Sequence, residues 1–281
     1  MNPLVTASWL AGRLNDPDIT ILDATLPPVG VKPPVDTRAR YSAQHIPGAV
    51  FFDIEEFSDR SSPYPHMLLA PEAFSRSASG LGISEKMEIV VYEQEGVFSA
   101  PRAWWMLRTF GAANVYLLDG GLRAWLDAGL PTETGEIQRP PTTFHAAFNE
   151  RAVKDFTQMQ QLIAGRAQIL DARSAARFHG TAPEPRPGIH SGHMPGAANV
   201  PFTELQQAGR MKSVQELRQI LTSNRVDLEK PVTTTCGSGV TAAVVLLGLE
   251  LAGAKQVSLY DGSWAEYAAQ PGATIEEADR R

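Results

Sequence analysis

The chain has 281 residues, of which 43% are hydrophobic and 20% charged, and its formal net charge is −6. This length suits two domains of ordinary size, and the composition is typical of a soluble globular protein. The acidic balance argues against a nucleic-acid partner. A single cysteine excludes an internal disulfide framework and any CxxC metal or redox pair.

The first half of the chain begins without a basic region followed by an apolar segment, so we expect no secretory signal. No apolar run is long enough to span a bilayer, and we expect no membrane partner and a cytoplasmic location. The pattern then predicts a helix over 6–14 and a buried strand over 19–22 that ends at Asp23. A His-x-Pro-Gly-Ala segment follows at His45, and an apolar segment over 89–92 ends at Glu93.

The second half repeats this order. A helix near 157–162 precedes a strand over 168–170 that ends at Asp171, and a second His-x-Pro-Gly-Ala segment begins at His193. The offset is 148 residues for both the aspartates (171 − 23) and the histidines (193 − 45). A period this long predicts two domains of one α/β fold, each with a mostly parallel sheet flanked by helices.

The repeat divides the chain into a first domain over 1–135, a linker over 136–150 and a second domain over 151–281. The linker contains Pro140 and Pro141 and lacks a periodic apolar pattern. An alternative is that this segment is edge structure wrapped around the first domain.

Cys236, the one cysteine, follows a β-branched run over 232–235 and precedes an apolar segment from 240 to 251 that predicts a helix. Gly237 and Gly239 allow backbone amides to gather around the thiol at the start of this helix, an environment that favours the thiolate. The alternative is a small buried hydrophobic residue. Glu93 stands at the matching position of the first copy, so we expect that domain to be catalytically silent.

Several of these segments together resemble the two-domain rhodanese family of sulfurtransferases over nearly the whole chain. They are the repeat, both His-x-Pro-Gly-Ala segments, the Asp-Ala-Arg strand end and the loop Cys-Gly-Ser-Gly-Val-Thr at 236–241. The loop is most similar to the 3-mercaptopyruvate branch of the family, as are the segments at 99–105 and 260–264.

The resemblance implies that the Cys236 thiolate takes sulfur from 3-mercaptopyruvate as a persulfide and releases pyruvate. An acceptor, thioredoxin or a small thiol or cyanide, then removes the sulfur, and no cofactor is needed. The amides of the loop can stabilise the persulfide anion. These belong to Gly237, Gly239, Val240 and Thr241, with Ser238 between them.

A keto-acid substrate requires a cation with paired donors, which arginine provides best. The family places two arginines nine residues apart before the second His-x-Pro-Gly-Ala segment, and Arg177 and Arg186 match this spacing (186 − 177 = 9). The alternative is that both are solvated surface charges. Arg173, at the Asp-Ala-Arg strand end, is interpreted as structural.

The family also implies a proton relay, for which Ser238, His45 and Asp36 are the candidates. The alternative makes Ser238 a turn residue and His45 a hydrogen-bonded turn histidine, because His193 repeats it in the second copy. His66 and His179 stand alone, and no spacing typical of a metal site is present.

Three other functions compete with this interpretation. A cysteine phosphatase or arsenate reductase needs an arginine at the end of the loop, where this chain has Ala242. A thiosulfate sulfurtransferase is the runner-up, although that branch is expected to carry basic residues in the loop. A persulfide carrier or regulatory binding module is the non-enzymatic alternative.

Overall fold

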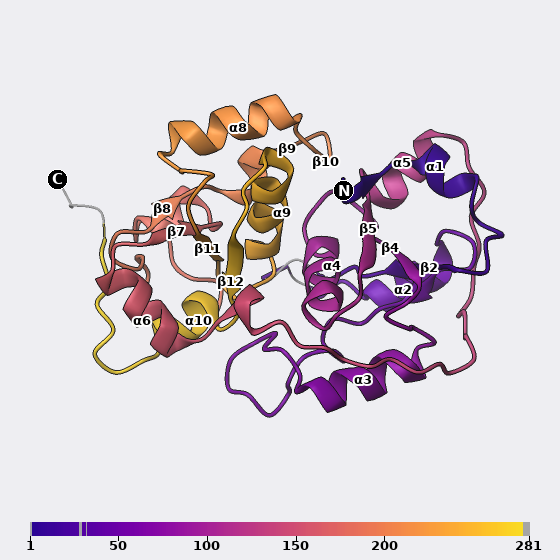
Figure 1. Cartoon of the computed structure of the whole chain (residues 1–281), viewed down its shortest axis with the longest axis horizontal. Helices are drawn as coiled ribbons and strands as arrows, with labels where there is room; N and C mark the ends of the chain where they lie inside the picture. The colour runs from indigo at the N-terminus through magenta and orange to yellow at the C-terminus, as the bar shows by residue number, and fades with distance from the viewer. Residues whose placement is uncertain (1, 28–29, 32, 278–281) are drawn as a thin grey trace. The chain divides into compact units, whose positions relative to one another are not determined.

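The computed structural model describes residues 2–27, 30–31 and 33–277, which form two compact units (Figure 1). The first unit takes its residues from 1–59, 68–149 and 208–211, and the second from 60–67, 150–207 and 212–281. Each unit therefore contains a short segment from the other half of the sequence.

The first unit is built on a five-stranded sheet of order β1-β5-β4-β2-β3 in which every described pair is parallel. Its strands are β1 (Leu4–Val5), β2 (Ile19–Asp23), β3 (Val50–Phe51), β4 (Glu88–Tyr92) and β5 (Asn114–Leu118). Its helices are α1 (Ala7–Ala11), α2 (Thr37–Ala43), α3 (Pro71–Gly80), α4 (Ala100–Thr109) and α5 (Gly121–Asp127). Fully buried residues such as Leu10, Val90 and Trp125 pack the sheet against its helices.

The second unit repeats the arrangement with the sheet order β6-β12-β11-β7-β8, again parallel throughout. Its strands are β6 (Val153–Lys154), β7 (Gln168–Asp171), β8 (Ala198–Asn199), β11 (Val232–Thr235) and β12 (Val257–Tyr260). Its helices are η1 (Glu150–Ala152), α6 (Phe156–Ala164), α7 (Ala175–Phe178), η2 (Phe202–Leu205), α8 (Val214–Ser223), α9 (Ala242–Ala252) and α10 (Ser263–Tyr267). Two further short strands, β9 (Gln206–Gln207) and β10 (Arg210–Met211), lie between η2 and α8 in the sequence.

Helices cover both faces of the second sheet, with α8 and α9 on one side and α6 and α10 on the other (Figure 1). On the α6 side, Met159 from α6, Ile169 from β7 and Trp264 from α10 form a buried cluster. Helix α9 is buried along nearly its whole length, as its continuous apolar sequence predicts. The predicted fold class, two tandem parallel α/β domains, is therefore confirmed.

Local sequence signals explain where several helices begin. The Thr6 side chain accepts a hydrogen bond from the Trp9 amide at the start of α1. Asp155 and Gln158 form a reciprocal capping box at the start of α6, and Ser213 and Glu216 form another at α8. These caps fix the ends of the helices that pack on the sheets.

The segment between the two repeats lies along the first unit. The Thr142 amide donates to the Ser79 carbonyl at 2.9 Å, and the Ala147 amide donates to the Phe110 carbonyl at 2.9 Å. This segment is extended, without helix or strand, up to η1.

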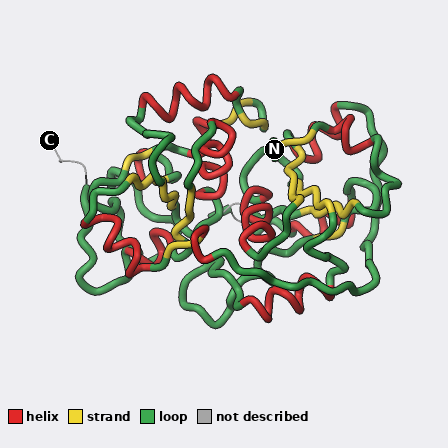
Figure 2. The backbone as a smooth tube through the Cα atoms, in the orientation of Figure 1, coloured by secondary structure: helices red, strands yellow, loops and turns green. Residues whose placement is uncertain are grey.

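The connection from β3 to α3 is one continuous loop in Figure 2. Residues 60–67 of this loop cluster with the second unit although they lie far from it in sequence. The Gln270 side-chain amide donates to the Tyr64 hydroxyl at 3.0 Å, which ties the loop to the end of the second repeat. The loop thus brings residues from the first half of the sequence to the second sheet.

Candidate functional site

Cys236 lies at the carboxyl end of β11, the central strand of the second sheet. Thr235, just before it, is in register with Asp171 at the end of β7. Loops at this edge of a parallel sheet are the usual place for ligands. The cysteine is 2% exposed and carries a free thiol.

The loop after Cys236 leads directly into helix α9. Gly239 has a φ of +79°, a left-handed conformation that glycine adopts without strain, and Thr241 is the N-cap of the helix. The loop therefore brings Cys236 close to the amino terminus of an eleven-residue helix, where the backbone dipoles favour negative charge.

Helix α10 holds the base of the loop from the other side. The Trp264 amide donates to the Cys236 carbonyl at 2.9 Å, and the Ala265 amide donates to the Gly237 carbonyl at 3.0 Å. Ser263, at a positive φ of 50°, accepts the Cys236 amide hydrogen at 3.3 Å and donates to the Tyr260 carbonyl at 2.9 Å. Non-glycine residues with positive φ are uncommon and persist where the surrounding contacts enforce them.

Arg177, on α7, lies against the loop. A Cβ atom added at Gly237 would be 2.8 Å from Arg177 Nη2, so a side chain there would displace the guanidinium from its present place. The side chain of Arg177 is 24% exposed, and its Nε and Nη2 donate to Glu184. A positive group with planar donors thus lies one residue from the cysteine. Arg186 is half-buried two residues after Glu184, and its contribution stays a prediction.

Arg173 is fully buried and has a structural environment. It binds both carboxylate oxygens of Asp171, Glu184 Oε1 at 2.8 Å and the Gly192 carbonyl at 2.8 Å, and its guanidinium lies 4.3 Å from the Trp264 ring centre. Burial lowers the pKa of Arg173, but the two carboxylates outweigh this effect and raise it, so the group stays charged.

The histidine that pairs with Ser238 is His66, whereas the relay expected from the sequence used His45. The Ser238 hydroxyl lies 3.0 Å from His66 Nδ1, and both residues are buried. His45 instead places its Nδ1 2.9 Å from the Tyr41 carbonyl. The exposed Asp36 caps helix α2 by accepting the Ala39 amide. His45 is thus a hydrogen-bonded turn histidine and Asp36 a helix N-cap, and their part in a proton relay stays a prediction.

One signal in the sequence distinguishes the two histidines. His45 and His193 are repeated, and each pairs its backbone with the strand-like segment after the last helix of its unit, at Glu133 and Glu276. A residue shared by both copies serves the fold that both copies share. His66 has no such counterpart, because the same offset (66 + 148 = 214) leads to Val214.

The first unit shows what occupies the matching loop when the cysteine is absent. Glu93 follows β4 and is 3% exposed, and its carboxylate accepts the amides of Phe98, Ser99 and Ala100 at 2.7–3.1 Å. The donors belong to the turn that begins α4, so the carboxylate fills the anion-favouring position at the helix start. This side chain occupies the loop and leaves no nucleophile there.

Glu93 is expected to make the stability of the first unit depend on pH. Burial raises the pKa of Glu93 from its ordinary 4.5 to about 7, although the hydrogen bonds from the amides act in the opposite direction. The folded state then binds the proton more tightly, so the stabilisation is greatest at low pH and is lost as pH rises through about 7. Between about pH 5.5 and about pH 8 the loss should be about 2 kcal/mol.

Thermal unfolding of the wild type and of Glu93→Gln at both pH values tests this expectation. The variant lacks the titrating group, so the wild type should lose more stability than the variant on going to the higher pH. An equal change in both proteins would show that Glu93 keeps an ordinary pKa.

Two kinds of feature are absent from residues 2–27, 30–31 and 33–277. No group of three or more His, Cys, Asp or Glu side chains in these ranges could hold a metal ion. No helix there combines the length and the hydropathy needed to cross a membrane.

Comparison with known proteins agrees with this geometry. The rhodanese-like domain profile matches residues 6–128 and again 155–270. The 3-mercaptopyruvate sulfurtransferase of Escherichia coli K12 is 47% identical over 275 residues, covering 97% of each chain, and that of Homo sapiens is 45% identical, covering 94% of this chain and 91% of the human protein.

The crystal structure of SseA from Escherichia coli matches with a TM-score of 0.87 at 45% identity, over 94% of this chain and 99% of that one. The two profile matches coincide with the two sheets, and the relatives span both. The chain therefore belongs to the rhodanese family and contains two copies of the rhodanese-like domain.

Proposed function

We propose that this protein is a 3-mercaptopyruvate sulfurtransferase in which Cys236 carries the transferred sulfur. The observation that supports this most directly is the guanidinium of Arg177 beside Gly237, next to a cysteine in a loop without charged residues. A monoanionic keto acid fits one such cation, whereas a phosphate dianion would meet no charge within the loop.

In the first half-reaction the Cys236 thiolate attacks the sulfur of 3-mercaptopyruvate. The new S–S bond forms as the carbon–sulfur bond breaks, and that electron pair passes to the enolate of pyruvate. Ser238 supplies the proton that the enolate takes up to become pyruvate, and its hydrogen-bonded contact with His66 supports this role. The enzyme is left as a Cys236 persulfide.

In the second half-reaction an acceptor attacks the outer sulfur and restores the Cys236 thiolate. The acceptor is a thiol, such as thioredoxin or a small thiol, or cyanide. The chain has one cysteine, so a resolving thiol must come from another molecule. We place this cycle in the cytoplasm, where free thiols stay reduced.

Parallel assays with 3-mercaptopyruvate and with thiosulfate test the proposed donor. Pyruvate release and sulfur transfer to cyanide should be much faster with 3-mercaptopyruvate. A preference for thiosulfate would instead assign the chain to the thiosulfate branch. A stoichiometric persulfide without turnover would make it a carrier.

Arg177→Ala and, separately, Arg186→Ala are expected to raise KM for 3-mercaptopyruvate. Each change removes a charged hydrogen bond to the substrate carboxylate, worth about 1.5–3 kcal/mol, so KM should rise by about ten-fold or more. Steady-state kinetics of each variant provide the measurement. An unchanged KM would remove that arginine from the donor site.

A further inference from the structure

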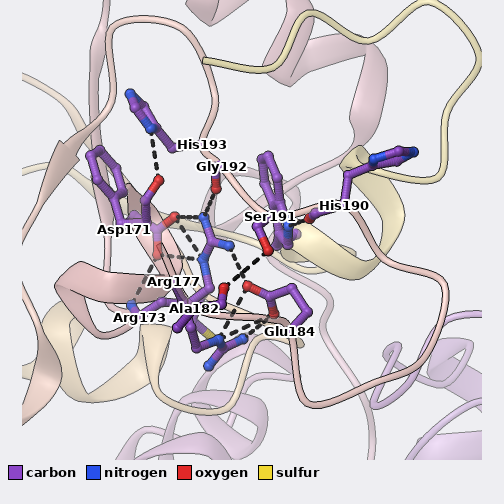
Figure 3. A network of polar contacts seen from close by, with 12 residues as sticks. Asp171, Arg173, Arg177, Ala182, Glu184, His190, Ser191, Gly192 and His193 are labelled. Carbon is purple, nitrogen blue, oxygen red and sulfur yellow. Dashed lines mark hydrogen bonds and ion pairs between the residues drawn. The ribbon is translucent and has the colours of Figure 1, made fainter. Parts of the chain in front are cut away.

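Charged side chains form an alternating chain that ends at the nucleophile loop (Figure 3). Asp171 binds Arg173, Arg173 binds Glu184, and Glu184 binds Arg177. Two carboxylates thus balance two guanidiniums. The side chains of the first three residues are at most 3% exposed, and only Arg177 reaches solvent.

Glu184 is the shared member of this chain. Its Oε1 accepts Arg173 Nη1 at 2.8 Å and Arg177 Nε at 3.1 Å, while its Oε2 accepts Arg177 Nε at 3.2 Å and Arg177 Nη2. Arg173 is itself anchored to Asp171 and Gly192. Glu184 therefore connects Arg177 to the rigid end of strand β7.

The loop that carries Glu184 is closed on itself. The Ser191 hydroxyl donates to the Ala182 carbonyl at 3.0 Å, and the Trp264 indole donates to the His190 carbonyl at 2.7 Å (Figure 3). These bonds hold residues 182–192 against the unit that contains Cys236. The Glu184 carboxylate is therefore fixed from both sides, by its loop and by Arg173.

Only one edge of the Arg177 guanidinium is used by this contact. Nε and Nη2 face Glu184, and Nη1 makes no hydrogen bond to any of the residues that the structure describes. Nη1 and Nη2 lie 4.0 Å and 2.8 Å from the place of a Cβ at Gly237. The long Arg177 side chain is thereby held in one orientation beside the loop. Its Nη1 remains available to donate hydrogen bonds to a ligand.

We propose that Glu184 is a positioning residue for sulfur-donor binding. It holds Arg177 so that Nη1 meets the carboxylate of the donor next to Cys236. The identity of the donor in this inference rests on the proposed function. The orientation of the Arg177 guanidinium does not depend on it.

The direction in which donor affinity changes distinguishes a positioning role of Glu184 from a purely electrostatic one. Loss of the Glu184 charge makes the site one unit more positive, which by itself would strengthen the binding of an anion. Loss of the positioning contact would weaken it, because a released guanidinium must be ordered again on binding. The two explanations therefore predict opposite changes.

Glu184→Gln and Glu184→Asp test the proposal together. The first keeps the length and removes the charge, and the second keeps the charge and shortens the reach to two arginines. We expect both to raise KM for 3-mercaptopyruvate by about ten-fold, with kcat changed by less than about three-fold. An unchanged or lower KM in Glu184→Gln overturns the proposal.

Alkylation of Cys236 gives a readout that does not depend on the physiological donor. Iodoacetate carries a carboxylate and iodoacetamide is its neutral analogue, and the single cysteine makes the rate unambiguous. The iodoacetate-to-iodoacetamide rate ratio should fall by about three-fold or more in both variants. A ratio that stays constant or rises contradicts the positioning role, even if 3-mercaptopyruvate proves not to be the donor.

Glu229→Gln is the matched control. It removes one negative charge from the same unit, at an exposed side chain paired with Lys255. We expect its KM and its alkylation ratio to equal those of the wild type. Thermal unfolding of each variant confirms that the assays report on folded protein, and Glu184→Asp carries the test if Glu184→Gln is unfolded at the assay temperature.

Discussion

Replacing Cys236 with serine is expected to abolish pyruvate release from 3-mercaptopyruvate, with a loss of roughly 10⁴-fold or more in kcat. A hydroxyl has a far higher pKa than a thiol and cannot carry the sulfane sulfur. The fold should survive, since serine is smaller than cysteine and the loop is held through backbone atoms by Trp264 and Ala265.

Mass spectrometry provides the second measurement for this variant. Wild-type protein incubated with 3-mercaptopyruvate without an acceptor should gain one sulfur atom, and cyanide should remove it. The variant should gain none. Turnover retained by the variant would contradict the thiolate mechanism.

Replacing His66 with alanine is expected to lower kcat by about 100-fold, the usual contribution of a positioned proton-transfer group. The change removes the partner of the Ser238 hydroxyl, at 3.0 Å, so the enolate would have to be protonated by water.

His45→Ala is the comparison variant for this prediction. His45 is fully buried, stacks on Tyr41 with ring centres 4.3 Å apart and binds its backbone carbonyl, so its loss should lower the melting temperature. The kcat of the folded protein should change little. A large loss of kcat in His45→Ala, with near-normal kcat in His66→Ala, would restore the relay expected from the sequence.

The repeat made the fold predictable, because two copies of the same apolar segments constrain each other. Strand β11 begins and ends where the β-branched run does, at Val232 and Thr235, and helix α9 occupies the apolar run that follows. The position of Cys236 at a strand end follows from local sequence alone. These features depend on neighbours within a few residues, which sequence patterns report well.

Contacts between distant segments were not predictable in the same way. His66 lies 172 residues from Ser238, on a loop without periodic pattern that clusters with the second unit. Glu184 is ordinary in a polar loop, and its importance comes from the two arginines that it binds at once. Both are long-range or multi-centre arrangements, and a single sequence carries no direct record of them.

The carboxylate of Glu93 has a wider meaning for this architecture. Where a parallel strand turns into a helix, unpaired amide hydrogens lie close together whether or not a reaction takes place, and they need a hydrogen-bond acceptor at that point. One copy meets this demand permanently with a glutamate held by Phe98, Ser99 and Ala100. The other copy places its free thiol, Cys236, at the corresponding strand end, so one position of the fold holds a hydrogen-bonded carboxylate in one half of the chain and the single cysteine in the other.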